Sequence, residues 1–107
     1  MRIDDDFDKA LKPPRPPKET SLESRLREWC VAHGWIYQKN EGPRNFPDRT
    51  IIGPGWVCFL ELKRKGHKPR IGQIQTIHTL QDLGHHAEWT DDFDQAIQIL
   101  TKISNER

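Results

Sequence analysis

Two carboxylates and a lysine lie at a spacing that can bring them together in the middle of the chain. Asp48 leads into a short run of strand-forming residues, and Glu61 lies near the end of the next such run, beyond a Gly-Pro-Gly turn. This pattern predicts a β-hairpin, whose strands place Asp48 close to Glu61. Taken alone, Pro47-Asp48 is also a common turn start, and the alternation Glu61-Leu62-Lys63 occurs on many solvated strands.

Carboxylates held close together repel each other, so such a pair is costly unless a cation joins it. Oxygen ligands from carboxylates and a backbone carbonyl suit Mg²⁺ or Mn²⁺. Lys63 shares a predicted strand face with Glu61 and can orient a water molecule or stabilise charge on a phosphate. A hard metal ion, a positioned water and a lysine are together the components of phosphodiester hydrolysis.

A cluster of basic residues follows this lysine. No acidic residue occurs between Leu62 and Gly72, whereas five basic residues do: Lys63, Arg64, Lys65, Lys68 and Arg70. The whole chain has 17 basic and 16 acidic residues and a net charge of +1, so bulk charge does not mark a nucleic-acid-binding protein. The local cluster nevertheless provides attraction for phosphates. Arg44 and Arg49, which flank Pro47-Asp48, are either further phosphate contacts or solvated loop charges.

Hydrophobic periodicity predicts the elements that position these groups. A helix is expected from Thr20 or Ser21 to His33, with Thr20 and Glu23 at the spacing of a capping box and Gly34 at its end. Strands are expected over 35–37, 49–52, 56–63 and 85–89, and helices over 73–83 and from position 91 or 92 onward. The order helix, three strands, helix, strand, helix predicts a small α/β sandwich with a mixed sheet.

The third predicted strand is apolar on both faces for most of its length. One face carries Trp56, Cys58, Leu60 and Leu62, and the other carries Val57, Phe59, Glu61 and Lys63. Because alternate residues point to opposite sides of a strand, we expect a layer of structure on each side of the sheet. The polar end of the second face predicts a site at the carboxyl end of this strand.

Length and composition limit the remaining possibilities. The 107 residues suffice for one domain, which we place at residues 20–107. Residues 1–19 are acidic and then proline-rich, which predicts a mobile arm: a solvated tail, a clamp on a partner subunit or a ligand of a proline-binding groove. Two cysteines, Cys30 and Cys58, exclude a disulfide framework and favour a reducing intracellular compartment. The five histidines have no familiar zinc spacing, and no apolar run could cross a bilayer.

The motifs and their order resemble the VRR-NUC branch of the PD-(D/E)xK nucleases. Pro47-Asp48 and Glu61-Leu62-Lys63 match the signature of the superfamily. The branch adds a helix glutamate before the Pro-Asp, a glycine after the lysine, a glutamine at the start of the next helix and a leucine beyond it. Those positions correspond here to Glu23, Gly66, Gln73 and Leu80.

The chain departs from the pattern of the branch in its loops. Asn45-Phe46 stands where a glycine is usual before the Pro-Asp, and Arg70-Ile71-Gly72 replaces the serine that often caps the glutamine helix. Gln75 competes with Gln73 for the position of the glutamine.

The resemblance implies a restriction-endonuclease-like fold and a nuclease that depends on a divalent metal. Asp48, Glu61 and the Leu62 carbonyl would bind Mg²⁺ or Mn²⁺, and Lys63 would help to activate the attacking water. Glu23 would complete the acidic cluster directly, through water or by holding a basic partner, although a capping role competes for the same side chain. Gln73 would position water or Lys63.

Small free-standing members of this branch occur in phages, resemble Holliday-junction resolvases and often act as homodimers. The resemblance therefore implies a homodimeric, structure-selective DNA endonuclease that acts on branched DNA in the cytoplasm of a bacterium or a phage-infected cell. Two alternatives stay open. The chain is otherwise a non-catalytic nucleic-acid-binding or packaging accessory protein of the same fold, or an interaction adaptor that uses its proline-rich arm.

Overall fold

The computed structural model describes residues 21–106, so the predicted arm and Thr20 lie outside the described residues. The elements in chain order are α2 (Leu22–Ala32), β1 (Ile36–Lys39), β2 (Arg49–Gly53), β3 (Trp56–Leu62), α3 (Ile71–Asp82), β4 (His86–Thr90) and α4 (Phe93–Glu106). The predicted order of elements is confirmed. No helix in this described part of the chain is long and apolar enough to span a membrane.

The four strands form one mixed sheet, as predicted, and their order in the sheet is β1-β2-β3-β4. β1 pairs antiparallel with β2, β2 pairs antiparallel with β3, and β3 pairs parallel with β4. Parallel neighbours require a crossover connection, which α3 supplies. The turn between β2 and β3 contains Gly55 with φ of +81°, a left-handed conformation that glycine adopts without strain.

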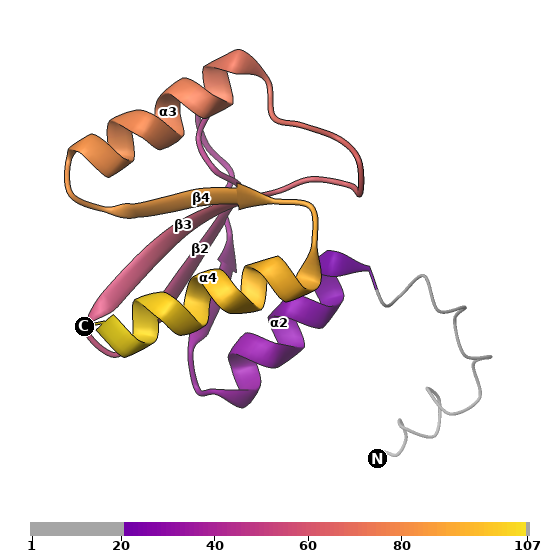
Figure 1. The fold of residues 1–107 in the computed structure, drawn as a ribbon, viewed down its shortest axis with the longest axis vertical. Helices are drawn as coiled ribbons and strands as arrows, with labels where there is room; N and C mark the ends of the chain where they lie inside the picture. Colours follow the sequence, from indigo (N-terminus) through magenta and orange to yellow (C-terminus); the bar gives the residue numbers. More distant parts are fainter. Residues whose placement is uncertain (1–20, 107) are drawn as a thin grey trace, which may run out of the picture.

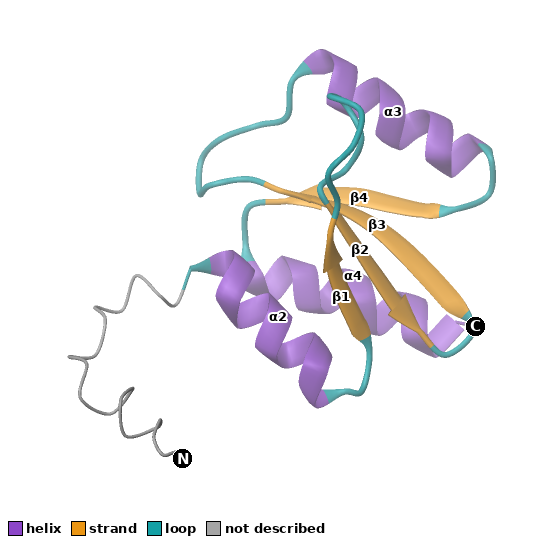
Figure 2. Ribbon diagram, turned by 180° about the vertical axis from the view of Figure 1, so that it is seen from behind, coloured by secondary structure: helices purple, strands orange, loops and turns teal. Residues whose placement is uncertain are grey.

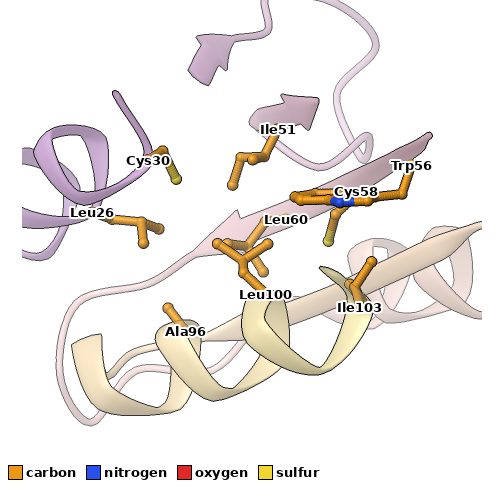
Figure 3. Packing of buried hydrophobic residues seen from close by; sticks show 9 residues of the cluster. All are labelled: Leu26, Cys30, Ile51, Trp56, Cys58, Leu60, Ala96, Leu100 and Ile103. Atoms are coloured by element: carbon orange, nitrogen blue, oxygen red, sulfur yellow. The ribbon is translucent and has the colours of Figure 1, made fainter. Parts of the chain in front are cut away.

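Helices cover both faces of the sheet, as the two faces of β3 predicted. Figures 1 and 2 show α3 on one side and α2 with α4 on the other. In the larger core, side chains of α2, β2, β3 and α4 point toward one another (Figure 3): Leu26, Cys30, Ile51, Trp56, Cys58, Leu60, Ala96, Leu100 and Ile103. A smaller cluster of Ile77, Leu80 and Ala87 lies between α3 and β4. Packing on both sides therefore holds the strand that carries Glu61.

Cysteine and tryptophan side chains contribute to this packing. Cys30 and Cys58 are buried free thiols, and burial raises the pKa of each to about 12. Neither thiol is therefore ionised near neutral pH. Trp56 is buried in the larger core, Trp29 and Trp35 pack against it, and Trp89 packs against the smaller cluster.

The ends of the elements differ from the sequence predictions by one or two residues, and two of these differences concern candidate site residues, Gln73 and Glu23. Helix α3 begins at Ile71 rather than at Gln73. Helix α2 has Ser21 as its N-cap, and the Ser21 hydroxyl oxygen accepts the N–H of Ser24 at 3.4 Å. Glu23 therefore does not stand at the third helical position, and its predicted place in a capping box is wrong.

Candidate active site

The hairpin brings Asp48 and Glu61 together at one end of the sheet, as the sequence predicted. In the β2–β3 register Arg49 pairs with Leu60, which places Asp48 opposite Glu61. The Asp48 N–H donates to Glu61 Oε1 at 3.1 Å, and the Leu62 N–H donates to Asp48 Oδ1 at 3.3 Å. Each carboxylate is thus tied to the backbone of the opposite side of the hairpin.

Glu61 is only 4% exposed, and its second oxygen meets two donors. Gln73 Nε2 donates to Glu61 Oε2 at 2.9 Å, and Lys63 Nζ lies 3.2 Å from the same oxygen. Burial raises the pKa of Glu61 above its ordinary value of 4.5, and the charge of Asp48 raises it further, while Lys63 acts in the opposite direction. Repulsion between the two carboxylates therefore persists, and a bound cation would relieve it.

Gln73, rather than Gln75, occupies the glutamine position of the site. Gln73 is 5% exposed and its Oε1 accepts the Arg70 N–H at 2.9 Å, which turns its NH₂ group toward Glu61. Gln75 is exposed. The start of α3 is fixed in turn by the loop before Asp48, because Asn45 lies so close to Gly72 that an added Cβ would meet its side chain at 2.6 Å.

Arg49 connects Asp48 to helix α2. Its guanidinium lies 2.8 Å from Glu23 Oε2 and 3.2 Å from Asp48 Oδ2, and its Nε donates to the Tyr37 hydroxyl at 2.9 Å. Because Arg49 is 4% exposed and already has three protein partners, the structure does not present it as the phosphate contact that the sequence suggested. Glu23 reaches the site by holding this basic partner, which was one of its three predicted roles.

Two residues at the site were not predicted from the sequence. Tyr37 receives the bond from Arg49 just described. Asn40 Nδ2 donates to the Pro47 carbonyl at 3.0 Å, and the Asn40 N–H donates to the Asp48 carbonyl at 2.9 Å, so Asn40 binds the carbonyls of two successive residues. The contacts of Tyr37 and of Asn40 depend on the pairing of β1 with β2, and neither residue belongs to a short motif.

The acidic residues of the site suit a magnesium ion. Among residues 21–106, no three histidine, cysteine or acidic side chains are grouped so that they could hold a metal. The oxygen atoms that the site offers to a cation are those of the Asp48 and Glu61 carboxylates, followed on β3 by the Leu62 carbonyl. Mg²⁺ is usually held by one or two carboxylates and several waters, so this set fits it. Glu23 is engaged by Arg49 and adds no direct ligand.

The predicted basic cluster lies on the surface, but acidic residues from another loop reach it. Its exposed members are Arg64, Lys65, Lys68 and Arg70, and Arg44 is also exposed. Lys65 Nζ lies 3.4 Å from Asp92 Oδ1, and Asp91 Oδ2 accepts the Gly66 N–H at 2.9 Å. Exposed pairs of this kind are weak, so Lys65 can exchange Asp92 for another anion.

Two cavities flank the carboxylates. One, of about 340 Å³, is lined by Asp48, Glu61 and Gln73 together with the loop over 40–47. The other, of about 610 Å³, also includes Asp48 but is lined by Lys63 and by the amino ends of α2 and α4. A substrate bound at Asp48 therefore has space on two sides.

A solved structure described as a VRR_NUC domain shares this arrangement of elements. The match has a TM-score of 0.63 and covers 80% of this chain and 94% of that one, with 20% sequence identity. The chain has a VRR_NUC-like fold. No protein-family model matches the sequence, and no curated protein matches it. At 20% identity the VRR_NUC likeness establishes the fold alone.

The charge of Asp48 should be visible in the titration of Glu61. Asp48→Asn removes a charge that raises the pKa of Glu61, while the amide oxygen of the new side chain can still accept the Leu62 N–H, so this pKa should fall. A carbon-13 NMR titration of the metal-free protein measures it. Glu88, whose pKa is also raised by burial but without Asp48 among its causes, is the internal control and should not move.

The raised pKa of Glu61 also predicts how the stability of the fold depends on pH. Because folding raises the pKa of Glu61, its ionisation costs stability as pH rises from 4.5 through the folded-state value. The metal-free Asp48→Asn variant should lose less stability over that interval. An unchanged pKa of Glu61 in this variant would contradict the coupling between the two carboxylates.

Proposed function

We propose that the protein is a divalent-metal-dependent endonuclease that hydrolyses phosphodiester bonds in DNA. The observation that carries this proposal is the Asp48–Glu61 pair, held beside a lysine whose Nζ lies 3.2 Å from Glu61. The VRR_NUC-like fold supports it, because nuclease is the activity that this kind of domain is named for. A non-catalytic accessory protein has no need for a buried carboxylate held against a second one that repels it.

In this proposal Asp48, Glu61 and the Leu62 carbonyl hold Mg²⁺ or Mn²⁺. The ion, when bound, polarises the phosphate and lowers the pKa of a water molecule. Lys63, anchored by the bond from its N–H to the Thr90 carbonyl at 3.0 Å, orients the attacking water or stabilises charge on the phosphate. Gln73 keeps Glu61 in place by donating to Oε2, and also lies where it can orient water or Lys63.

We further propose that the substrate is branched DNA, such as a Holliday junction, and that the active form is a homodimer. A two-fold dimer presents two identical sites to the two related strands of a junction. The exposed side chains of Arg44, Arg64, Lys65, Lys68 and Arg70 are the proposed phosphate contacts. The buried free thiols fit a reducing cytoplasm, either bacterial or phage-infected.

A cleavage assay tests the proposed activity. The full-length protein should cut one or more of a panel of branched and linear DNAs with Mg²⁺ or Mn²⁺ and none with EDTA. Lys63→Ala should reduce the rate by about 100-fold or more, because it removes the ammonium group that orients the attacking water or stabilises charge on the phosphate. Lys102→Ala, which removes an exposed lysine from α4, is the matched control and should leave the rate within about twofold.

Two outcomes of this assay count against the proposal. Cleavage that persists in EDTA, or at an unchanged rate in Lys63→Ala, would contradict the assigned mechanism. Tight DNA binding without cleavage under any of these conditions would favour the accessory protein over the nuclease.

The basic loop should determine the salt dependence of DNA binding. Replacing Lys65, Lys68 and Arg70 with alanine should weaken binding to every DNA tested and reduce the slope of log K against log salt. For duplex DNA the slope should fall by about 0.9 for each phosphate that the variant no longer neutralises. Fluorescence anisotropy without metal measures the slope, and an unchanged slope would place the DNA path elsewhere, with Arg44 as the next candidate.

A further inference from the structure

The larger cavity beside the carboxylates extends beyond what the proposed reaction requires. Its volume of about 610 Å³ lies within the range of roughly 300–1,000 Å³ that is usual for small-molecule sites. Asp48 and Lys63 contribute to its lining, and so do the amino ends of α2 and α4, which Figures 1 and 2 show side by side. A molecule bound there would lie next to Asp48 and Lys63, beside the proposed position of the phosphate that is cut.

A stacked cation–aromatic pair lines this cavity. The guanidinium carbon of Arg25, on α2, lies 4.0 Å from the centroid of the Phe93 ring at the start of α4. Both residues line the cavity, and Arg25 is exposed. Guanidinium planes and aromatic rings are the surfaces on which unpaired nucleic-acid bases stack. The pair therefore offers a place for a base.

Cations for a phosphate lie in the same cavity. Arg64 and Lys65 follow Lys63 at the end of β3, and both contribute to the lining. Arg64 is exposed, and the partner of Lys65 is Asp92 at 3.4 Å in a weak surface pair. The lining also contains acidic residues, of which Asp91 and Asp92 already contact the Gly66 N–H and Lys65. Arg64 and Lys65 are therefore the cations open to a phosphate, and Arg25 with Phe93 is the stacking surface for a base.

We propose that this cavity binds an unpaired nucleotide adjacent to the phosphate that is cut, with its base on Arg25 and Phe93 and its phosphate against Arg64 and Lys65. A base within continuous duplex enters such a site only after it is unpaired and unstacked, which is unfavourable. The preferred substrate class is therefore DNA with an unpaired nucleotide at the cut, such as a flap or a junction whose branch-point base pair has opened. The position of the cut rests on the proposed nuclease function, whereas nucleotide binding does not.

Two small probes of equal charge test the stacking site. Full-length protein in EDTA is titrated with 2′-deoxyadenosine 5′-monophosphate or with 2-deoxyribose 5-phosphate, which lacks the base, and binding is followed by amide NMR shifts. The base should improve affinity by roughly 5- to 150-fold. The shifted amides should include those of Arg25 and Phe93.

Variants separate stacking from charge. Arg25→Ala should bind the two probes with nearly equal affinity, and Phe93→Leu, which keeps an apolar side chain, should lose most of the preference for the base. Arg27→Ala removes the same charge from an exposed position on the same helix and should retain the preference. The proposal is overturned if wild type binds both probes equally, if the shifts lie away from the cavity, or if Arg27→Ala loses the preference as Arg25→Ala does.

Cleavage rates distinguish failure of this inference from failure of the proposed function. Rapid cutting of continuous duplex, at the rate of the same duplex with an unpaired nucleotide, would refute the subsite and leave the nuclease. Base-dependent nucleotide binding without cleavage of any DNA would refute the nuclease and leave the nucleotide site.

Discussion

The antiparallel register of β2 and β3 is the constraint on which the site depends. It sets Asp48 opposite Glu61, and the two crossed bonds to backbone N–H groups then hold each carboxylate. A slip of one residue would turn Glu61 to the other face of the sheet and expose Leu60, which is fully buried. Packing on both faces of β3 therefore protects the geometry of the carboxylates as well as the fold.

Holding two carboxylates together raises the free energy of the metal-free protein, and neighbouring elements offset part of that cost. Helix α3 supplies Gln73, the end of β3 supplies Lys63, and Arg49 joins Asp48 to Glu23 of helix α2. Contacts from different elements leave the site preorganised. The pKa of Glu61 nevertheless stays above its ordinary value, because burial and the charge of Asp48 both disfavour its ionised form. A divalent cation bound between Asp48 and Glu61 would offset the part of this cost that comes from repulsion, which is why we propose one here.

Local patterns were sufficient to predict the fold class and to nominate Asp48 and Glu61, because strand pairing in a hairpin brings their positions together. Gln73 was nominated by the resemblance to the VRR-NUC branch. Local patterns could not predict the partners of Arg49, because Tyr37 reaches it through the pairing of β1 with β2 and Glu23 lies on α2. From its position beside Pro47-Asp48 alone, Arg49 was open to a phosphate contact or a solvated charge. The capping role of Glu23 was predicted wrongly because two good cap residues adjoin each other at the start of α2, and the structure uses Ser21.

Calorimetric titration with Mn²⁺ tests most directly whether Asp48 and Glu61 are a metal site. The parent protein should bind Mn²⁺, and Asp48→Asn and Glu61→Gln should each weaken binding by about tenfold or more, because each removes a ligand charge. Glu88→Gln, which neutralises a carboxyl of β4 outside the site, should bind Mn²⁺ as the parent does. If both site variants bind Mn²⁺ as tightly as the parent, the two carboxylates are not its ligands and the account of this site is contradicted.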